Sequence, residues 1–178
     1  MRRQKISEKF SELRKKDEGA LICYIMAGDP TAEQTGEIVK ALVNGGADII
    51  ELGFPFSDPV ADGPTIQVAG QRALAAGMDT ERYFELVKAL KVRIPLVCMT
   101  YYNPVFRYGV EKFVEQAADA GISGLIVPDI PVEEVADLKY SCEKHGLDLI
   151  FWLLPQQPKQ ELERSWKRVQ VSSTLSQG

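Results

Sequence analysis

Residues 49–53 (Ile-Ile-Glu-Leu-Gly) and the loop after them, residues 54–65 (Phe-Pro-Phe-Ser-Asp-Pro-Val-Ala-Asp-Gly-Pro-Thr), decide the interpretation of this chain. The short apolar run 49–53 predicts a strand buried on both faces, as in a parallel sheet. Glu51 shares one face of this strand with Ile49, because side chains alternate between the two faces. A carboxylate placed there costs free energy unless it is paired or used. The segment therefore predicts the carboxyl end of a buried strand that opens into a functional site.

Strand and helix signals alternate along the rest of the chain, and no hairpin signal interrupts them. Strands are predicted over residues 20–27, 49–53, 95–100, 124–127 and 148–151. Helices are predicted around residues 6–13, then over 31–44, from 64 onward, and over 81–92, 110–120 and 132–145, with Thr31 and Thr80 as N-caps of two of them. This order predicts an α/β fold with a parallel sheet and helical crossovers. Function in such sheets gathers at the carboxyl ends of the strands.

Composition limits the classes of function that fit. The chain has 178 residues, a net charge of −4 and 26% charged residues, so it has no general basic field for nucleic acid. Three cysteines without C-x-x-C spacing argue against a metal site or a disulfide framework, and a single histidine argues against Ser-His or Cys-His catalysis. There is no phosphate-binding glycine motif, no secretory signal and no apolar run long enough for a membrane. We expect one domain in the cytoplasm.

Several motifs closely resemble the tryptophan synthase alpha chain family over about residues 5–151. The resemblance is carried by residues 24–30, 46–53, 55–59 and 61–67, by Tyr101 and Asn103, and by residues 131–134. It implies an eight-stranded (β/α) barrel and the retro-aldol cleavage of indole-3-glycerol phosphate to indole and glyceraldehyde 3-phosphate. It implies no cofactor for this half-reaction. It also implies a beta-chain partner, in a complex of two alpha and two beta chains, which condenses the indole with serine on its own pyridoxal phosphate.

The two predicted catalytic residues are Glu51 and Asp62, which match the family's two catalytic carboxylates. A carboxyl at an apolar barrel mouth suits proton transfer, because desolvation raises its pKa. Asp62 is placed to stabilise the positive charge on a protonated indole ring. The alternatives are a structural buried carboxylate at Glu51 and a plain N-cap at Asp62, just before Pro64.

The resemblance also implies an indole pocket and a partner loop. Tyr24, Tyr101, Ile126 and Pro128 match positions that line the pocket, although a core role fits both tyrosines nearly as well. Many members of the family carry a small residue where Pro128 stands. The loop that contacts the beta chain and closes over substrate matches four consecutive residues, Phe56, Ser57, Asp58 and Pro59, which could equally be a local cap.

The family pattern is expected to stop after Phe151. We expect residues 1–151 to form the N-terminal part of an incomplete barrel with about five βα units, and residues 152–178 to be a divergent tail without the family's phosphate-binding loops. Our hypothesis is a change of reading frame after Phe151. In the shifted frame residues 170–178 allow Gly-Phe-Ile-Tyr-Leu-Val-Ser-Arg, which resembles the family's next strand. Natural truncation and divergence are the alternatives.

An incomplete barrel leaves strand edges and apolar faces uncovered. We therefore expect marginal stability, self-association and little or no turnover. Two other interpretations of the function also fit the sequence. One is a different phosphate-sugar barrel enzyme, such as an epimerase or isomerase. The other is an inactive fragment that only docks to a beta chain through residues 56–59.

Overall fold

The computed structural model describes residues 3–131 and 133–151. Within them, five parallel strands pair in chain order. They are β1 (Ile22–Met26), β2 (Ile49–Gly53), β3 (Leu96–Met99), β4 (Gly124–Ile126) and β5 (Asp148–Ile150). This confirms the predicted α/β fold with a parallel sheet. One register row runs across the sheet through Tyr24, Glu51, Val97, Gly124 and Asp148, so these residues belong to the same face.

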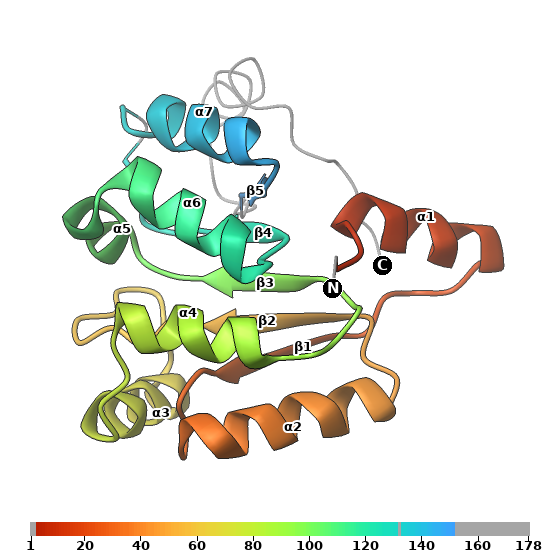
Figure 1. Ribbon diagram of the computed structural model, residues 1–178, viewed down its shortest axis with the longest axis horizontal. Helices are drawn as coiled ribbons and strands as arrows, with labels where there is room; N and C mark the ends of the chain where they lie inside the picture. Colours follow the sequence, from red (N-terminus) through yellow and green to blue (C-terminus); the bar gives the residue numbers. More distant parts are fainter. Residues whose placement is uncertain (1–2, 132, 152–178) are drawn as a thin grey trace.

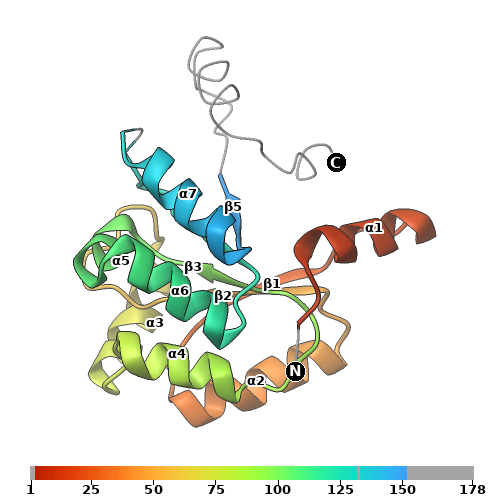
Figure 2. The same cartoon turned by 45° about the horizontal axis from the view of Figure 1, so that its top comes forward.

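Seven helices connect and cover the strands of the described region. They are α1 (Ile6–Lys16), α2 (Ala32–Asn44), α3 (Pro64–Ala75), α4 (Thr80–Ala89), α5 (Tyr102–Tyr108), α6 (Val110–Ala120) and α7 (Val135–His145). Helices α2, α4, α6 and α7 follow one another along one side of the sheet, as Figure 2 shows. Helix α1 lies apart from them (Figure 1, red). The opposite, inner face of the sheet is therefore the one available for a site.

One apolar cluster lies on each of the two faces of the sheet. The larger cluster lies between the sheet and the covering helices and includes Ile50, Leu52 and Leu125, which alternate with inner-face residues. The smaller cluster occupies the inner face and consists of Ile6, Ile49, Val97, Met99, Tyr101 and Ile126. Ile6 comes from α1 and approaches Gly124 closely. Helix α1 thus contributes to the apolar filling of the inner face.

Side-chain N-caps mark the starts of α2 and α4. Thr31 caps α2, since its hydroxyl accepts a hydrogen bond from the Gln34 backbone N–H at 3.2 Å, as predicted. The prediction that Thr80 caps the next helix is wrong. The cap is Asp79, whose carboxylate accepts from the Arg82 N–H at 2.9 Å, and Thr80 is the first helical residue. Asp79 is the cap because its carboxylate oxygen reaches a free backbone N–H of the first turn.

Other boundaries also differ from the prediction, and the helix predicted over residues 81–92 ends at Ala89. The segment after β3, which was not among the predicted helices, forms the short helix α5, in which Pro104 lies in the first turn where a missing N–H costs nothing. Helix α7 begins at Val135 rather than at 132. The predicted tail, residues 152–178, lies outside the described residues. No helix in the described part of the chain is long and apolar enough to cross a membrane.

Arg3 ties the ends of two helices together. Its guanidinium donates to the carbonyl oxygens of Ala120 and Gly121 at 2.8 and 2.7 Å, and to those of Val87 and Leu90 at 2.7 Å each. These carbonyls lie at the C-terminal ends of α6 and α4, where helices leave acceptors unpaired and carry partial negative charge. One side chain therefore fixes the spacing of two neighbouring βα units.

Candidate active site

Glu51 lies on the inner face of the sheet, near the carboxyl end of β2. It follows Ile49 of the inner apolar cluster by two residues and is half-buried. Burial raises the pKa of its carboxyl above the ordinary glutamate value. The described residues provide no ion pair for this carboxylate. A carboxyl in this position can hold and release a proton closer to neutral pH than an exposed one.

Tyr24 is the neighbour of Glu51 on β1, and the two residues are register partners. The Tyr24 ring leans over Gly53 at the end of β2. A Cβ atom at position 53 would therefore collide with the tyrosine hydroxyl. Burial raises the pKa of Tyr24 well above its usual value, and the charges of Asp62, Tyr101 and Glu51 add to the shift. This places Tyr24 among the other predicted site residues.

Tyr101, at the end of β3, joins the same group from the other side of β2. Its side chain is 1% exposed, and its hydroxyl oxygen accepts a hydrogen bond from the Ala61 backbone N–H at 3.1 Å. Burial first, and then the neighbouring Asp62 carboxylate, raise the pKa of Tyr101 to about 12. The tyrosine therefore holds the loop after β2 next to the inner face, with Asp62 beside it.

Asp62 is not the N-cap of α3, so the alternative reading of this residue is wrong. The cap position is Gly63, which has no side chain with which to cap the helix, and Pro64 is the first helical residue. The Asp62 backbone carbonyl accepts from the Gln67 side chain at 2.8 Å, which anchors the loop to the first turn of α3. The start of α3 does not use the Asp62 carboxylate, which lies beside Tyr101 and raises the pKa of its hydroxyl.

The predicted partner loop divides into buried and exposed residues. The Phe56 ring packs against the Tyr101 ring, with centroids 5.6 Å apart, and so belongs to the wall of the site. Ser57 and Asp58 are exposed and hydrogen-bond to each other, while Pro59 is partly buried. Val60, which comes next, is 77% exposed. The loop therefore presents a polar and apolar tip to solvent, with one aromatic ring turned inward.

The other two predicted pocket residues lie at the end of β4. Ile126 is 2% exposed and belongs to the inner apolar cluster with Met99 and Tyr101. Pro128 is half-buried, two residues further along. The structure thus brings Glu51, Tyr24, Tyr101 and Ile126 to one face.

Two residues of this region were not singled out from the sequence. Asp129 accepts a hydrogen bond from the Tyr102 backbone N–H at 2.8 Å, at the start of α5, and its charge acts on Tyr101. Gly53 provides the space into which Tyr24 leans. The sequence does offer a signal for Asp129, because it is an acidic residue that follows the end of strand β4. The role of Gly53 depends on a ring from another strand, which has no signal in the local sequence.

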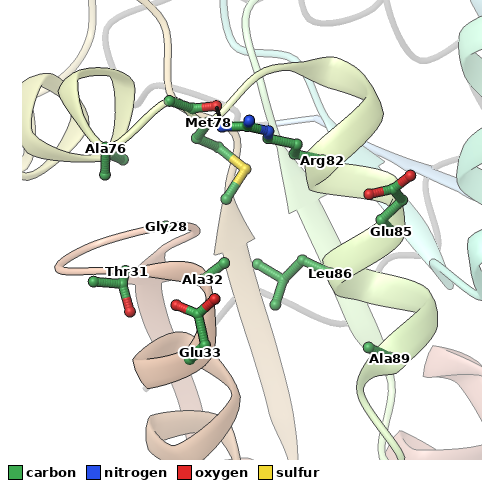
Figure 3. A pocket seen from close by; sticks show the side chains of 12 residues that line it. Gly28, Thr31, Ala32, Glu33, Ala76, Met78, Arg82, Glu85, Leu86 and Ala89 are labelled. Carbon is green, nitrogen blue, oxygen red and sulfur yellow. Dashed lines mark hydrogen bonds between the residues drawn. The ribbon is translucent and has the colours of Figure 1, made fainter.

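A hollow of about 680 Å³ lies elsewhere, between α2, α3 and α4 (Figure 3). Small and apolar side chains such as Ala32, Met78 and Leu86 line it, and Glu33 and Glu85 carry carboxylates on its wall. None of the predicted site residues lines this hollow. We regard it as a groove between helices, because it holds no group that the chemistry of the site requires. Among the described residues, no cluster of metal-ligating side chains occurs.

Comparison with known proteins identifies the relatives of this chain. The sequence model of the family described as tryptophan synthase alpha chain matches residues 10–171, and so continues past Phe151, where we expected the resemblance to end. The tryptophan synthase alpha chain of Methanosarcina barkeri is 82% identical over 168 residues, which are 94% of this chain and 64% of that protein. The Methanosarcina mazei alpha chain is 72% identical over 94% of this chain and 62% of its own length.

Solved structures agree with the sequence relatives. The tryptophan synthase alpha subunit of Legionella pneumophila is 35% identical with a TM-score of 0.87, and the match covers 93% of this chain and 64% of that one. A structure of tryptophan synthase from M. tuberculosis is 36% identical with a TM-score of 0.86, over 93% of this chain and 67% of that one.

Five parallel strands joined by helical crossovers, together with the match to a solved alpha subunit, define the described region as part of an incomplete (β/α) barrel. The family match shows which barrel this is. The chain belongs to the tryptophan synthase alpha chain family. It spans less than two thirds of the length of its curated relatives from M. barkeri and M. mazei.

Proposed function

We propose that this chain carries the acid–base half of a lyase site that cleaves indole-3-glycerol phosphate to indole and glyceraldehyde 3-phosphate. The observation that carries the proposal is the placement of Glu51 on the inner face, with a raised pKa, beside Tyr24 and the Asp62 loop. The alternative reading as an epimerase or isomerase of the same fold receives no support from the relatives, which are alpha chains. The cytoplasmic location expected from the sequence is part of the same proposal.

Glu51 is assigned the proton transfers. Cleavage requires a proton on the indole ring carbon that bears the side chain, and loss of the proton from the hydroxyl on the adjacent side-chain carbon. The carbon–carbon electron pair returns to the ring, and the O–H electron pair becomes part of the aldehyde carbonyl. The raised pKa of Glu51 suits both steps, because a carboxyl that is neither fully ionised nor fully protonated exchanges protons in both directions.

Asp62 is assigned the stabilisation of charge. Protonation of the ring carbon leaves positive charge centred on the indole nitrogen, and an anion nearby lowers the free energy of that state. The loop contact between Tyr101 and the Ala61 N–H keeps Asp62 next to the inner face. Tyr24, Tyr101 and Ile126 supply an aromatic and apolar wall suited to a flat ring, and Pro128 lies at the edge of this wall.

We propose a beta chain as the partner, bound by the exposed tip of the loop after β2. Ser57, Asp58 and Val60 are exposed there, and Phe106 of α5, which follows the carboxyl end of the neighbouring strand β3, is 62% exposed. Exposed apolar side chains next to polar ones are typical of interaction surfaces. The loop therefore connects the partner surface, at its tip, to the site wall, through Phe56.

The test is indole release from indole-3-glycerol phosphate by the full chain, alone and with a tryptophan synthase beta chain. Enzyme is kept in excess so that slow turnover is measurable. We expect slow release that the beta chain increases, and no release above background from Glu51→Gln. Glu18→Gln, at an exposed residue, is the matched control and should equal the wild type.

Two outcomes would contradict the proposal. Equal rates for wild type and Glu51→Gln would remove Glu51 from the chemistry. Activation of the beta chain without any indole release would instead favour the reading as a fragment that only docks.

A further inference from the structure

The hydroxyl of Tyr24 is a buried hydrogen-bonding group without a partner. Its oxygen is shielded from solvent, yet it makes no hydrogen bond within the described part of the chain. Leaving such a group unsatisfied costs free energy, and native proteins rarely do so. The other described side-chain atom in this condition is Arg3 Nε, whose guanidinium already makes four hydrogen bonds. Of these two side chains, Tyr24 is thus the one whose only polar group has no hydrogen-bond partner.

The position of this hydroxyl is fixed by its surroundings. Tyr24 is the register partner of Glu51, and its ring extends over Gly53, two residues further along the same face of β2. A side chain at position 53 would occupy the place of the hydroxyl. The tyrosine oxygen therefore lies at the carboxyl end of β2, where the proposed chemistry takes place.

The hydroxyl remains a donor under all ordinary conditions. Burial raises the pKa of the phenol, and the nearby charges of Asp62 and Glu51 raise it further. It is therefore protonated, lies close enough to Asp62 and Glu51 for their charges to act on it, and is hydrogen-bonded to neither of them. A neutral donor held beside catalytic carboxylates is suited to a ligand oxygen that approaches between them.

We propose that Tyr24 is a specificity-determining residue whose hydroxyl donates a hydrogen bond to the substrate hydroxyl oxygen that becomes the aldehyde oxygen. This inference rests on the proposed function, because Glu51 must take its proton from that same hydroxyl group. The substrate oxygen gives its proton to Glu51 and accepts a hydrogen bond from Tyr24, which keeps its own proton throughout. Negative charge that develops on the oxygen is stabilised by a donor already in place.

The inference separates two ligands that differ only in their hydroxyl groups. Indole-3-glycerol phosphate has hydroxyls on the carbon chain between the ring and the phosphate, whereas indole-3-propanol phosphate has none. Tyr24→Phe removes the hydroxyl and retains the ring, so packing against both ligands is the same. Only the first ligand can lose a hydrogen bond in this variant.

The experiment measures the dissociation constants of both ligands by calorimetry, using the full chain with Glu51→Gln to prevent turnover. We expect Tyr24→Phe to weaken binding of indole-3-glycerol phosphate by about two- to tenfold, as for the loss of one net hydrogen bond. Binding of indole-3-propanol phosphate should be unchanged or tighter, because the unpaired donor is gone. Tyr140→Phe, at a residue that is 68% exposed, is the control and should change neither constant.

The outcomes distinguish the two proposals. If both ligands bind and Tyr24→Phe affects them equally, or affects neither, Tyr24 has no role in recognising the hydroxyl and the inference is wrong. If neither ligand binds before Tyr24 is changed, the proposed substrate class is wrong, and this inference is wrong with it.

Discussion

The hydroxyl oxygen of Tyr101 accepts a hydrogen bond from the backbone N–H of Ala61 at 3.1 Å. This contact joins the end of β3 to the loop that follows β2, across 40 positions of sequence. It is also adjacent to Asp62, so the placement of a predicted catalytic carboxylate depends on a tyrosine from the neighbouring strand. The Phe56 ring packs on the same tyrosine and gives the loop a second attachment.

We predict that Tyr101→Phe loosens this loop without unfolding the chain. The ring and its contacts remain, but the Ala61 N–H loses its acceptor, which amounts to about 0.5–1.5 kcal/mol. Amide hydrogen exchange at Ala61 should accelerate by about two- to tenfold, while exchange in α6 stays the same. Unchanged exchange at Ala61 would show that other contacts hold the loop.

The strand around Glu51 and the loop around Asp62 differ in how far the sequence determines them. The bounds of β2 and α6 were predicted correctly, because apolar periodicity is a local property. The face on which Glu51 lies followed from alternation along the strand. The loop between them could not be derived in this way, since Ala61 is held by a residue from another βα unit. Its assignment to the site came from the resemblance.

Glu51 makes a prediction about pH and stability. Its pKa in the folded chain is raised by burial above the ordinary value of 4.5. The protonated carboxyl is therefore favoured in the folded state. Its contribution to stability is fully present below the unfolded pKa and is lost as pH rises through the folded pKa. Glu51→Gln should stabilise the chain at pH 7, by no more than about 1 kcal/mol because the half-exposed group is partly screened.

Urea denaturation at pH 7 and at pH 4 measures this effect. The stabilisation by Glu51→Gln should be smaller at pH 4, because the wild-type carboxyl is then protonated and uncharged, like the amide that replaces it. Glu18→Gln, at an exposed position, should show no such dependence. A gap between Glu51→Gln and wild type that stays constant over this range would mean that burial does not perturb the carboxyl.

Glu111 makes a prediction with the opposite sign. Its carboxylate accepts hydrogen bonds from Lys144 at 2.6 Å, His145 at 2.8 Å and Ser141 at 2.9 Å, and these lower its pKa to about 2. The carboxylate joins α6 to α7, so its contribution to stability is present above pH 4.5 and is lost as pH falls through about 2.

We expect Glu111→Gln to increase hydrogen exchange in α7 at pH 7 and to leave exchange in α2 unchanged. The difference from wild type should decrease in 1 M salt, because exposed ion pairs are screened. Glu115→Gln, on the same helix and also exposed, is the matched control. Equal exchange in α7 of wild type and Glu111→Gln would show that apolar packing alone holds this helix.

Arg3 should be sensitive even to a conservative change. Lysine has a single ammonium group and cannot reproduce the planar arrangement through which the guanidinium reaches four carbonyls. We predict that Arg3→Lys lowers the free energy of unfolding by about 2 kcal/mol, because some of the four carbonyl oxygens then lose their hydrogen bond to a charged donor. Denaturant titration checks this, with Arg14→Lys, on the exposed face of α1, as the control. Equal losses in the two variants would argue against the contact.

Gly53→Ala tests whether the glycine is needed to place Tyr24. A methyl group at position 53 collides with the far end of the tyrosine ring rather than with backbone, so the ring should rotate away while β2 stays intact. The hydroxyl then leaves the end of β2. We predict that Gly53→Ala weakens indole-3-glycerol phosphate binding about as much as Tyr24→Phe does. In combination the two changes should cost little more than either alone, because both remove the same hydrogen bond. Additive losses in this cycle would mean that Gly53 acts on the ligand by a route independent of the Tyr24 hydroxyl.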